Sequence, residues 1–182
     1  ETLTIASVIG REFTLEHLRP LIEDVSDDRL LEVLEEALAS RVIEEMTSTL
    51  GRYQFTHTLI KETLAGELST TRKVRLHARI AESLEEAYGE EAECHAAELA
   101  FHFAEAQTVL GSDRLVRYSL LAGDHALAAF AWEEAQTHFQ RGLTAKGVAL
   151  TGSEPAADKE AAALLFGQGR AMLSTVDRLE FH

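Results

Sequence analysis

Residues 42–56 read Val42-Ile43-Glu44-Glu45-Met46-Thr47-Ser48-Thr49-Leu50-Gly51-Arg52-Tyr53-Gln54-Phe55-Thr56. Before residue 42 the apolar residues recur at the spacing of a helix. Within 42–56 they no longer follow that spacing. The two ends of this stretch contain β-branched and aromatic residues, which favour strands. Gly51, near its middle, favours a turn. We therefore predict two strands, 42–47 and 52–56, joined by a turn at 48–51.

Helical patterns precede and follow the two predicted strands. Thr14 is the predicted N-cap of a short helix at 15–23, and Ser26 precedes a second helix at 27–40 whose first turn is acidic. A further helix is predicted to begin near His57. Helix, helix, β-hairpin, helix is the order expected of a winged-helix-like unit, with the hairpin as its wing.

Alanine content divides the chain into two parts. Residues 1–72 contain four alanines and residues 73–182 contain 23. Because alanine favours helix, the second part should be almost entirely helical. The predicted fold is therefore mainly α, with a winged-helix-like domain at 1–72 and an antiparallel helical array at 73–182. The array's predicted helices lie at 70–88, with Ser69 as cap and Gly89 as stop, and near 91–108, 113–130, 132–148 and 158–174.

A repeat-like pattern lies at Phe130-Ala131-Trp132-Glu133-Glu134-Ala135-Gln136-Thr137-His138-Phe139-Gln140-Arg141-Gly142-Leu143. It resembles the turn and second helix of a tetratricopeptide repeat. In this interpretation Ala135 and Gly142 let neighbouring helices approach, while Trp132 and Phe139 fill the grooves. The helical array at 73–182 is then tetratricopeptide-like and truncated at its C-terminus.

The charge of the chain excludes some classes of partner. Its 182 residues carry 17 Lys and Arg against 31 Asp and Glu, a formal net charge of -14. Such a charge repels phosphate, which disfavours general binding to nucleic acid or to an anionic membrane. No run of about 18 apolar residues is present, so no membrane span is predicted.

The N-terminus and the cysteine content indicate the setting of the chain. The sequence from Glu1 has no signal-peptide pattern and no initiator Met, so we expect an excised segment of a larger cytoplasmic protein. Cys94 is the only cysteine, which excludes an intramolecular disulfide and a multi-cysteine zinc site.

Four segments together resemble a known family. They are Ala6–Phe13, Phe55–Leu64, Thr71–Glu85 and Ala97–Phe103. They resemble the region that follows the nucleotide-binding domain in signal-transduction ATPases of the STAND class. This class includes the large ATP-binding LuxR-type bacterial regulators and the ATPase modules joined to bacterial adenylate cyclases.

The resemblance implies a regulatory segment without catalysis of its own, coupling the nucleotide state of a parent protein to binding of a partner or inducer. It implies ATP or ADP as the ligand of the parent and the upstream ATPase domain as a partner. A protein or small-molecule inducer is expected on the repeat surface. No Gly-rich loop followed by Gly-Lys-Ser/Thr occurs here, so no cofactor is expected in the segment itself.

His57 is the residue to which the resemblance gives a cofactor-binding role. In relatives with a Met-His-Asp motif, a histidine at the start of a winged-domain helix contacts the β-phosphate of ADP and helps to hold the closed state. An imidazole beside a helix N-terminus suits phosphate. Thr58 stands where that motif has Asp, a departure from the pattern. The alternative is that His57 merely caps or packs at the strand–helix junction.

A basic run in this acidic chain comprises Arg72, Lys73, Arg75, His77 and Arg79. One interpretation is that it meets phosphate or an acidic surface of the ATPase domain. The other is a solvated helix face that balances nearby glutamates. We favour the solvated or interdomain interpretation.

His95, Glu98 and His102 recur at i, i+3 and i+7, with Cys94 adjacent, and such a triplet suits a metal ion. A metal-dependent hydrolase is therefore one alternative function. The apolar residues around the triplet favour repeat packing instead, and we predict no metal site and no catalytic residue. A plain helical-repeat scaffold without a nucleotide role is the other alternative.

The helix at 27–40 is the one that would read DNA in a winged helix. It carries one arginine, Arg29, against several acidic residues, and the predicted wing adds two more. We expect such a face to be repelled by a phosphate backbone, so no direct nucleic-acid contact is predicted. The acidic residues are Asp27, Asp28, Glu32, Glu35, Glu36, Glu44 and Glu45.

Overall fold

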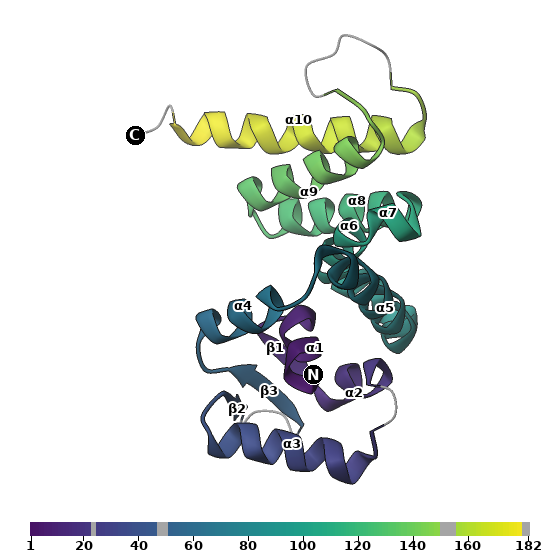
Figure 1. Cartoon of the computed structure of the whole chain (residues 1–182). Helices are drawn as coiled ribbons and strands as arrows, with labels where there is room; N and C mark the ends of the chain where they lie inside the picture. The colour runs from purple at the N-terminus through teal and green to yellow at the C-terminus, as the bar shows by residue number, and fades with distance from the viewer. Residues whose placement is uncertain (23–24, 47–50, 150–155, 180–182) are drawn as a thin grey trace. The chain divides into compact units, whose positions relative to one another are not determined.

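The computed structural model describes residues 1–22, 25–46, 51–149 and 156–179. The chain forms two compact units, Glu1–Ala87 and Tyr88–His182 (Figure 1). The predicted division at residue 72 falls near the start of helix α5 (Thr70–Tyr88), most of which belongs to the first unit. Within the described ranges, every helix is too short or too polar to cross a membrane.

A small antiparallel sheet lies in the first unit. Its strands are β1 (Glu12–Thr14), β2 (Ile43–Glu45) and β3 (Arg52–Phe55), in the order β1-β3-β2. The two predicted strands are confirmed as β2 and β3, and the sequence missed β1. The predicted turn at 48–51 lies outside the described residues except for Gly51, whose φ of 74° is easily adopted only by glycine.

Aromatic side chains hold β1 against β3. Phe13 pairs with Tyr53 across the two strands, and the centroids of their rings are 5.7 Å apart. Phe13 also lies 5.6 Å from the ring of Phe55, which is fully buried. These contacts supply the apolar burial that a strand of three residues cannot obtain alone.

Five helical segments accompany the sheet before α5: α1 (Thr2–Ile9), α2 (Leu15–Leu18), the 3-10 helix η1 (Arg19–Leu21), α3 (Asp27–Ala39) and α4 (Thr58–Gly66). Thr14 caps α2 as predicted, because its hydroxyl accepts a hydrogen bond from the backbone N–H of His17 (3.1 Å). The helix predicted at 15–23 instead divides into α2 and η1 at Pro20, which lacks a backbone N–H.

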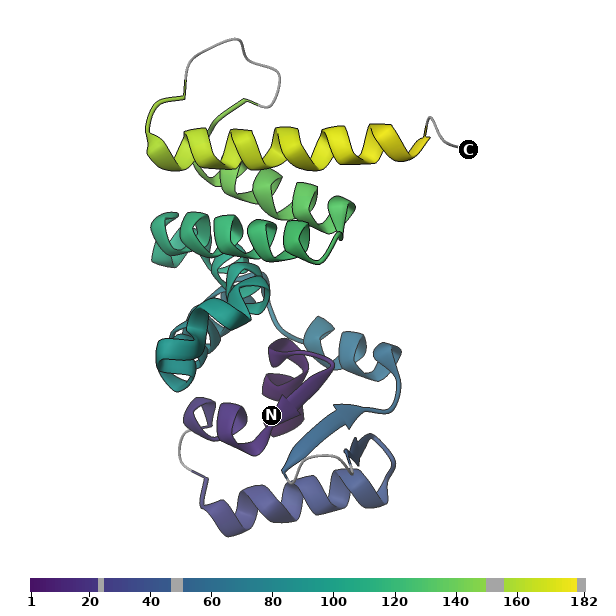
Figure 2. The ribbon, with the colours of Figure 1, turned by 180° about the vertical axis from the view of Figure 1, so that it is seen from behind.

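Helix α3 lies alongside the β2–β3 hairpin in both ribbon views (Figures 1 and 2). Leu30 and Leu34 are buried as its spacing predicts, and so is Ile43 on the neighbouring strand β2. Leu31, a neighbouring apolar residue of α3, is 41% exposed. It lies one residue away from Leu30, about 100° around the helix, and so misses the buried face.

Helix α5 begins and ends as predicted. The Ser69 hydroxyl accepts from the backbone N–H of Arg72 (3.4 Å), and Gly89 follows the last residue with a φ of 51°. Leu76, Ile80 and Leu84 are buried along one stripe. Ala87, at the last turn, is exposed.

The described residues of the second unit form helices joined by short connections, and they contain no strand. Its elements are η2 (Gly89–His95), α6 (Ala96–Glu105), α7 (Gln107–Leu110), α8 (Asp113–Ala128), α9 (Trp132–Ala145) and α10 (Lys159–Leu179). The single helix predicted at 91–108 is therefore wrong. It divides at His95 and at Ala106, where the backbone leaves the helical conformation. Gly111 follows α7 with a φ of 76° and separates it from α8.

Helices α8, α9 and α10 pack as successive layers (Figure 2). The fully buried ring of Phe139 on α9 lies between them. A Cβ atom added at Gly123 on α8 would lie 2.4 Å from this ring, and one added at Gly167 on α10 would lie 2.5 Å from it. The predicted roles of Phe139 and Gly142 in helix packing are thus confirmed, whereas Trp132 is only half-buried.

Candidate functional sites

His57 is the N-cap residue of α4 and its side chain is exposed. Its backbone carbonyl accepts from the N–H groups of Ile60 (3.1 Å) and Lys61 (3.4 Å), so the cap is formed by the main chain. The imidazole makes no capping hydrogen bond. Of the two interpretations offered by the sequence, capping therefore accounts for the backbone of His57 and leaves its side chain available.

The first turn of α4 offers both polar and apolar groups around that imidazole. The turn contains no acidic residue, so no carboxylate offsets the positive end of the helix dipole there. Thr58 is exposed, and the Leu59 side chain is 72% exposed. An exposed imidazole, helix N–H groups and a projecting leucine can together contact a phosphate and an apolar surface beside it.

The acidic residues predicted on α3 are exposed. These are Asp27, Asp28, Glu32, Glu35 and Glu36, and Glu44 and Glu45 of β2 are exposed as well. Arg29, which belongs to α3 itself, lies 2.7 Å from the Glu32 carboxylate, which raises the pKa of the guanidinium above its ordinary value. The surface that would have to approach DNA thus keeps its negative charge.

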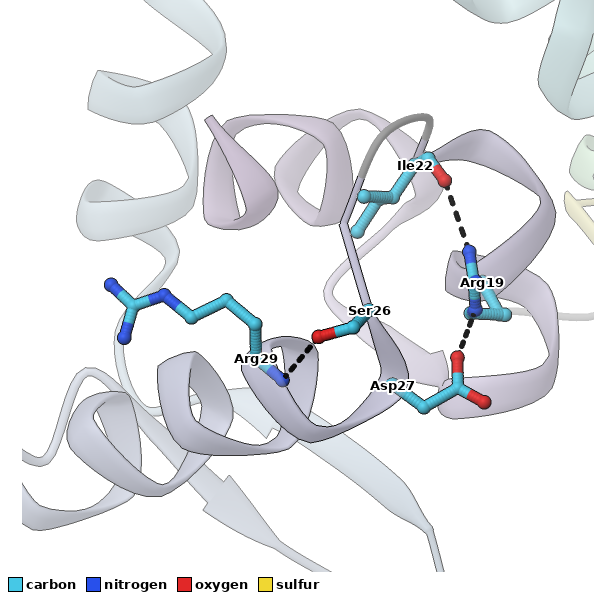
Figure 3. Close-up of polar contacts among 5 residues, drawn as sticks. All are labelled: Arg19, Ile22, Ser26, Asp27 and Arg29. Atoms are coloured by element: carbon cyan, nitrogen blue, oxygen red, sulfur yellow. Dashed lines mark hydrogen bonds and ion pairs between the residues drawn. The ribbon is translucent and has the colours of Figure 1, made fainter.

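Polar contacts also fix the start of α3 (Figure 3). The Ser26 hydroxyl accepts from the backbone N–H of Arg29 (3.3 Å), as predicted for an N-cap. Arg19 reaches the same helix end from η1, with its Nε 2.5 Å from Asp27 and its Nη1 donating to the carbonyl of Ile22 (3.1 Å). Arg19 therefore links η1 to the start of α3.

The basic run of α5 divides into residues with different surroundings. Arg72, Arg75 and Arg79 line a cavity of about 790 Å³ in the first unit, together with residues of α1, η1 and the segment after α4. His77 is buried instead, and Lys73 does not line this cavity. The helical spacing of the three arginines explains why they share one side of α5.

The three arginines of the cavity differ in their hydrogen-bond and ion-pair partners. Arg72 Nη2 forms an ion pair with Glu1 Oε1 (2.5 Å), and Arg79 Nη2 donates to the carbonyl of Leu21 (3.3 Å). Neither partner lies on α5, so both arginines tie this helix to the N-terminal residues. Within the described part of the chain, Arg75 makes no hydrogen bond or ion pair.

The candidate metal triplet has a structural explanation. His95 is the last residue of η2, not part of the helix that carries Glu98 and His102, and its ring stacks on Tyr88 with centroids 3.7 Å apart. The Tyr88 hydroxyl donates to Glu98 Oε2 (2.7 Å), and His102 is fully buried in α6. Among the residues that the structure describes, no three His, Cys, Asp or Glu side chains are grouped to hold a metal ion.

His138 is a buried titratable residue that the sequence reasoning treated only as part of the repeat pattern. Its Nε2 lies 3.6 Å from Glu134 Oε1, one turn earlier on α9. Burial, aided by the charge of Arg141, nevertheless lowers the pKa of the imidazole below its ordinary value of 6.5. The histidine is therefore neutral near pH 7 and belongs to the packed interior of the helical array.

The cavity is the feature that sequence reasoning missed. Its arginines were identified, and their spacing at i, i+3 and i+7 was a usable signal. The apolar side chains that join them come from distant segments, so their proximity depends on tertiary packing. These side chains are Ile5, Leu21, Ile22, Val25, Leu68 and Leu76.

Comparison with protein-family models, with curated proteins and with solved structures finds no match to this chain.

Proposed function

We propose that the chain is a non-catalytic regulatory segment of a STAND-type ATPase, in which the first unit contacts the upstream nucleotide-binding domain. The observation that carries the proposal is the exposed pair His57 and Leu59 in the first turn of α4. The fold uses the main chain of His57 and leaves its imidazole exposed. This is the arrangement that a phosphate-contacting histidine at a domain interface requires.

The order of elements in the first unit supports the same proposal. A short strand, two helices and a hairpin whose second strand pairs with the first strand are consistent with a winged-helix-like unit. Its α3 surface is too acidic for a phosphate backbone. We therefore assign this unit to protein contact and leave any DNA binding to another domain of the parent.

The second unit would carry the partner or inducer surface. Layered helices with glycines at their contacts are consistent with a tetratricopeptide-like array, and such arrays offer extended surfaces to partners. A plain scaffold without a nucleotide role is the second candidate, favoured by the same packing around Phe139. The two candidates differ in whether α4 contacts a nucleotide-binding domain.

A binding experiment separates these candidates. The chain is added to the purified upstream domain of the parent, loaded with ADP or with a non-hydrolysable ATP analogue, and association is followed by calorimetry. We expect tighter binding to the ADP form, and Leu59→Asp should weaken that binding by roughly tenfold, because a charge replaces an apolar contact. Val109→Asp, at a side chain 56% exposed in the second unit, is the control.

Two results contradict the proposed function. One is equal binding to the ADP and ATP forms, which leaves the scaffold candidate. The other is an equal effect of Leu59→Asp and Val109→Asp on binding, which would show that α4 is not the contact surface.

A further inference from the structure

We propose that the cavity of the first unit binds a small organic anion with an apolar body. We call it the arginine-lined cavity, after Arg72, Arg75 and Arg79 of α5. Its volume of about 790 Å³ lies within the range of roughly 300–1,000 Å³ typical of small-molecule sites. The site belongs to the first unit alone, so it stands independently of any inducer surface on the helical array.

The apolar part of the lining selects the body of the ligand. Leu21 and Ile22 of the η1 segment and Leu76 of α5 are almost fully buried, and they lie beside the half-buried Ile5 and Leu68. These side chains come from α1, from the η1 segment, from the segment after α4 and from α5. An apolar ligand body would remove their remaining exposed surface from water, which favours binding.

The charged part of the lining selects the sign of the ligand. Among the residues that the structure describes, three arginines line the cavity against two acidic residues, Glu1 and Glu67, so this described part of the lining is net positive in a chain of net charge -14. Glu1 is already held by Arg72. A guanidinium binds a carboxylate, sulfonate or phosphate with two parallel N–H donors, which a cationic or neutral ligand does not match.

Arg75 is the residue best placed to pair with that anion. It lies one turn from both Arg72 and Arg79, and those two arginines make contacts with Glu1 and the Leu21 carbonyl. Within the described ranges Arg75 makes no contact of this kind, and its side chain is exposed. A bound anion would therefore gain a charge-assisted hydrogen bond there without breaking one of the fold.

The test uses a matched pair of fluorescent probes. One is 8-anilinonaphthalene-1-sulfonate, an anion with an apolar body, and the other is N-phenyl-1-naphthylamine, its neutral counterpart. Each is titrated into the chain and into the variants Arg75→Gln and Lys73→Gln, with amide chemical shifts recorded to locate the probe. Lys73 is the control, because it lies on the same helix and does not line the cavity.

We expect the anionic probe to shift amides of α1, η1 and α5 in the wild-type chain. Arg75→Gln should weaken its binding by roughly fivefold or more, the loss expected for one charge-assisted hydrogen bond. Lys73→Gln should leave it unchanged, and neither variant should change binding of the neutral probe. A larger side chain in the cavity, Leu68→Trp, should weaken both probes.

Three results would overturn the proposal. The first is amide shifts confined to other parts of the chain. The second is an equal loss of the anionic probe in Arg75→Gln and Lys73→Gln, which would indicate general charge attraction. The third is that Leu68→Trp, with a circular dichroism spectrum that matches the wild type, binds both probes as tightly as the wild type does.

Discussion

At the start of α3, the Ser26 hydroxyl accepts a hydrogen bond from a backbone N–H that has no carbonyl partner within the helix. Ser26 Oγ lies 3.3 Å from the N–H of Arg29 (Figure 3). Ser26→Ala removes this acceptor and should lower the free energy of unfolding of the chain by about 1 kcal/mol, measured by urea denaturation. Ser112 precedes α8 without a side-chain capping bond, so Ser112→Ala should cost much less. Equal losses in the two variants would contradict the capping role.

Signals of this kind were read correctly from the sequence because they act over about three residues. Thr14, Ser26 and Ser69 each accept a backbone hydrogen bond at the predicted helix start, and Gly89 follows α5 with a positive φ. The side chain of His57 was harder to place. Whether a histidine at a helix N-cap uses its ring or only its main chain depends on its surroundings in the folded unit.

Among the elements, α8, α9 and α10 depend on glycines that admit the ring of Phe139. Gly167→Ala adds a methyl group 2.5 Å from that ring and should lower the free energy of unfolding by about 1–3 kcal/mol. Gly169→Ala, on the same helix, meets nothing within 4 Å and should raise it by about 0.5–1 kcal/mol through helix propensity. Thermal unfolding checks both, and a stabilising Gly167→Ala would contradict the packing described here.

Elements were predictable where their own residues determine them. Apolar spacing predicts α5, the alanine-rich composition and the repeat-like pattern predict α8 and α9, and the interruption of helical spacing predicts β2 and β3. Strand β1 has three residues and exists through its pairing with β3, so no local pattern marks it. The 3-10 helix η2 was read as part of a longer helix because its composition, with Ala92 and several glutamates, is helical in character.

For the whole molecule, the first unit presents two separate features, the first turn of α4 and the arginine-lined cavity. The sequence pointed to His57 and to the arginines, since both involve residue types that stand out in an acidic, alanine-rich chain. It did not indicate the cavity, because α1, η1 and α5 meet only in the folded unit. Contact with a nucleotide-binding domain at α4 is the central claim of the functional account.

ADP retention tests that claim most directly. In the proposed parent ATPase, dissociation of a fluorescent ADP analogue is timed for the wild type, for His57→Ala and for His125→Ala, an exposed histidine on α8. The account predicts dissociation roughly tenfold faster in His57→Ala, the loss of one charge-assisted hydrogen bond to phosphate, and no change in His125→Ala. Equal dissociation rates in all three proteins would contradict it.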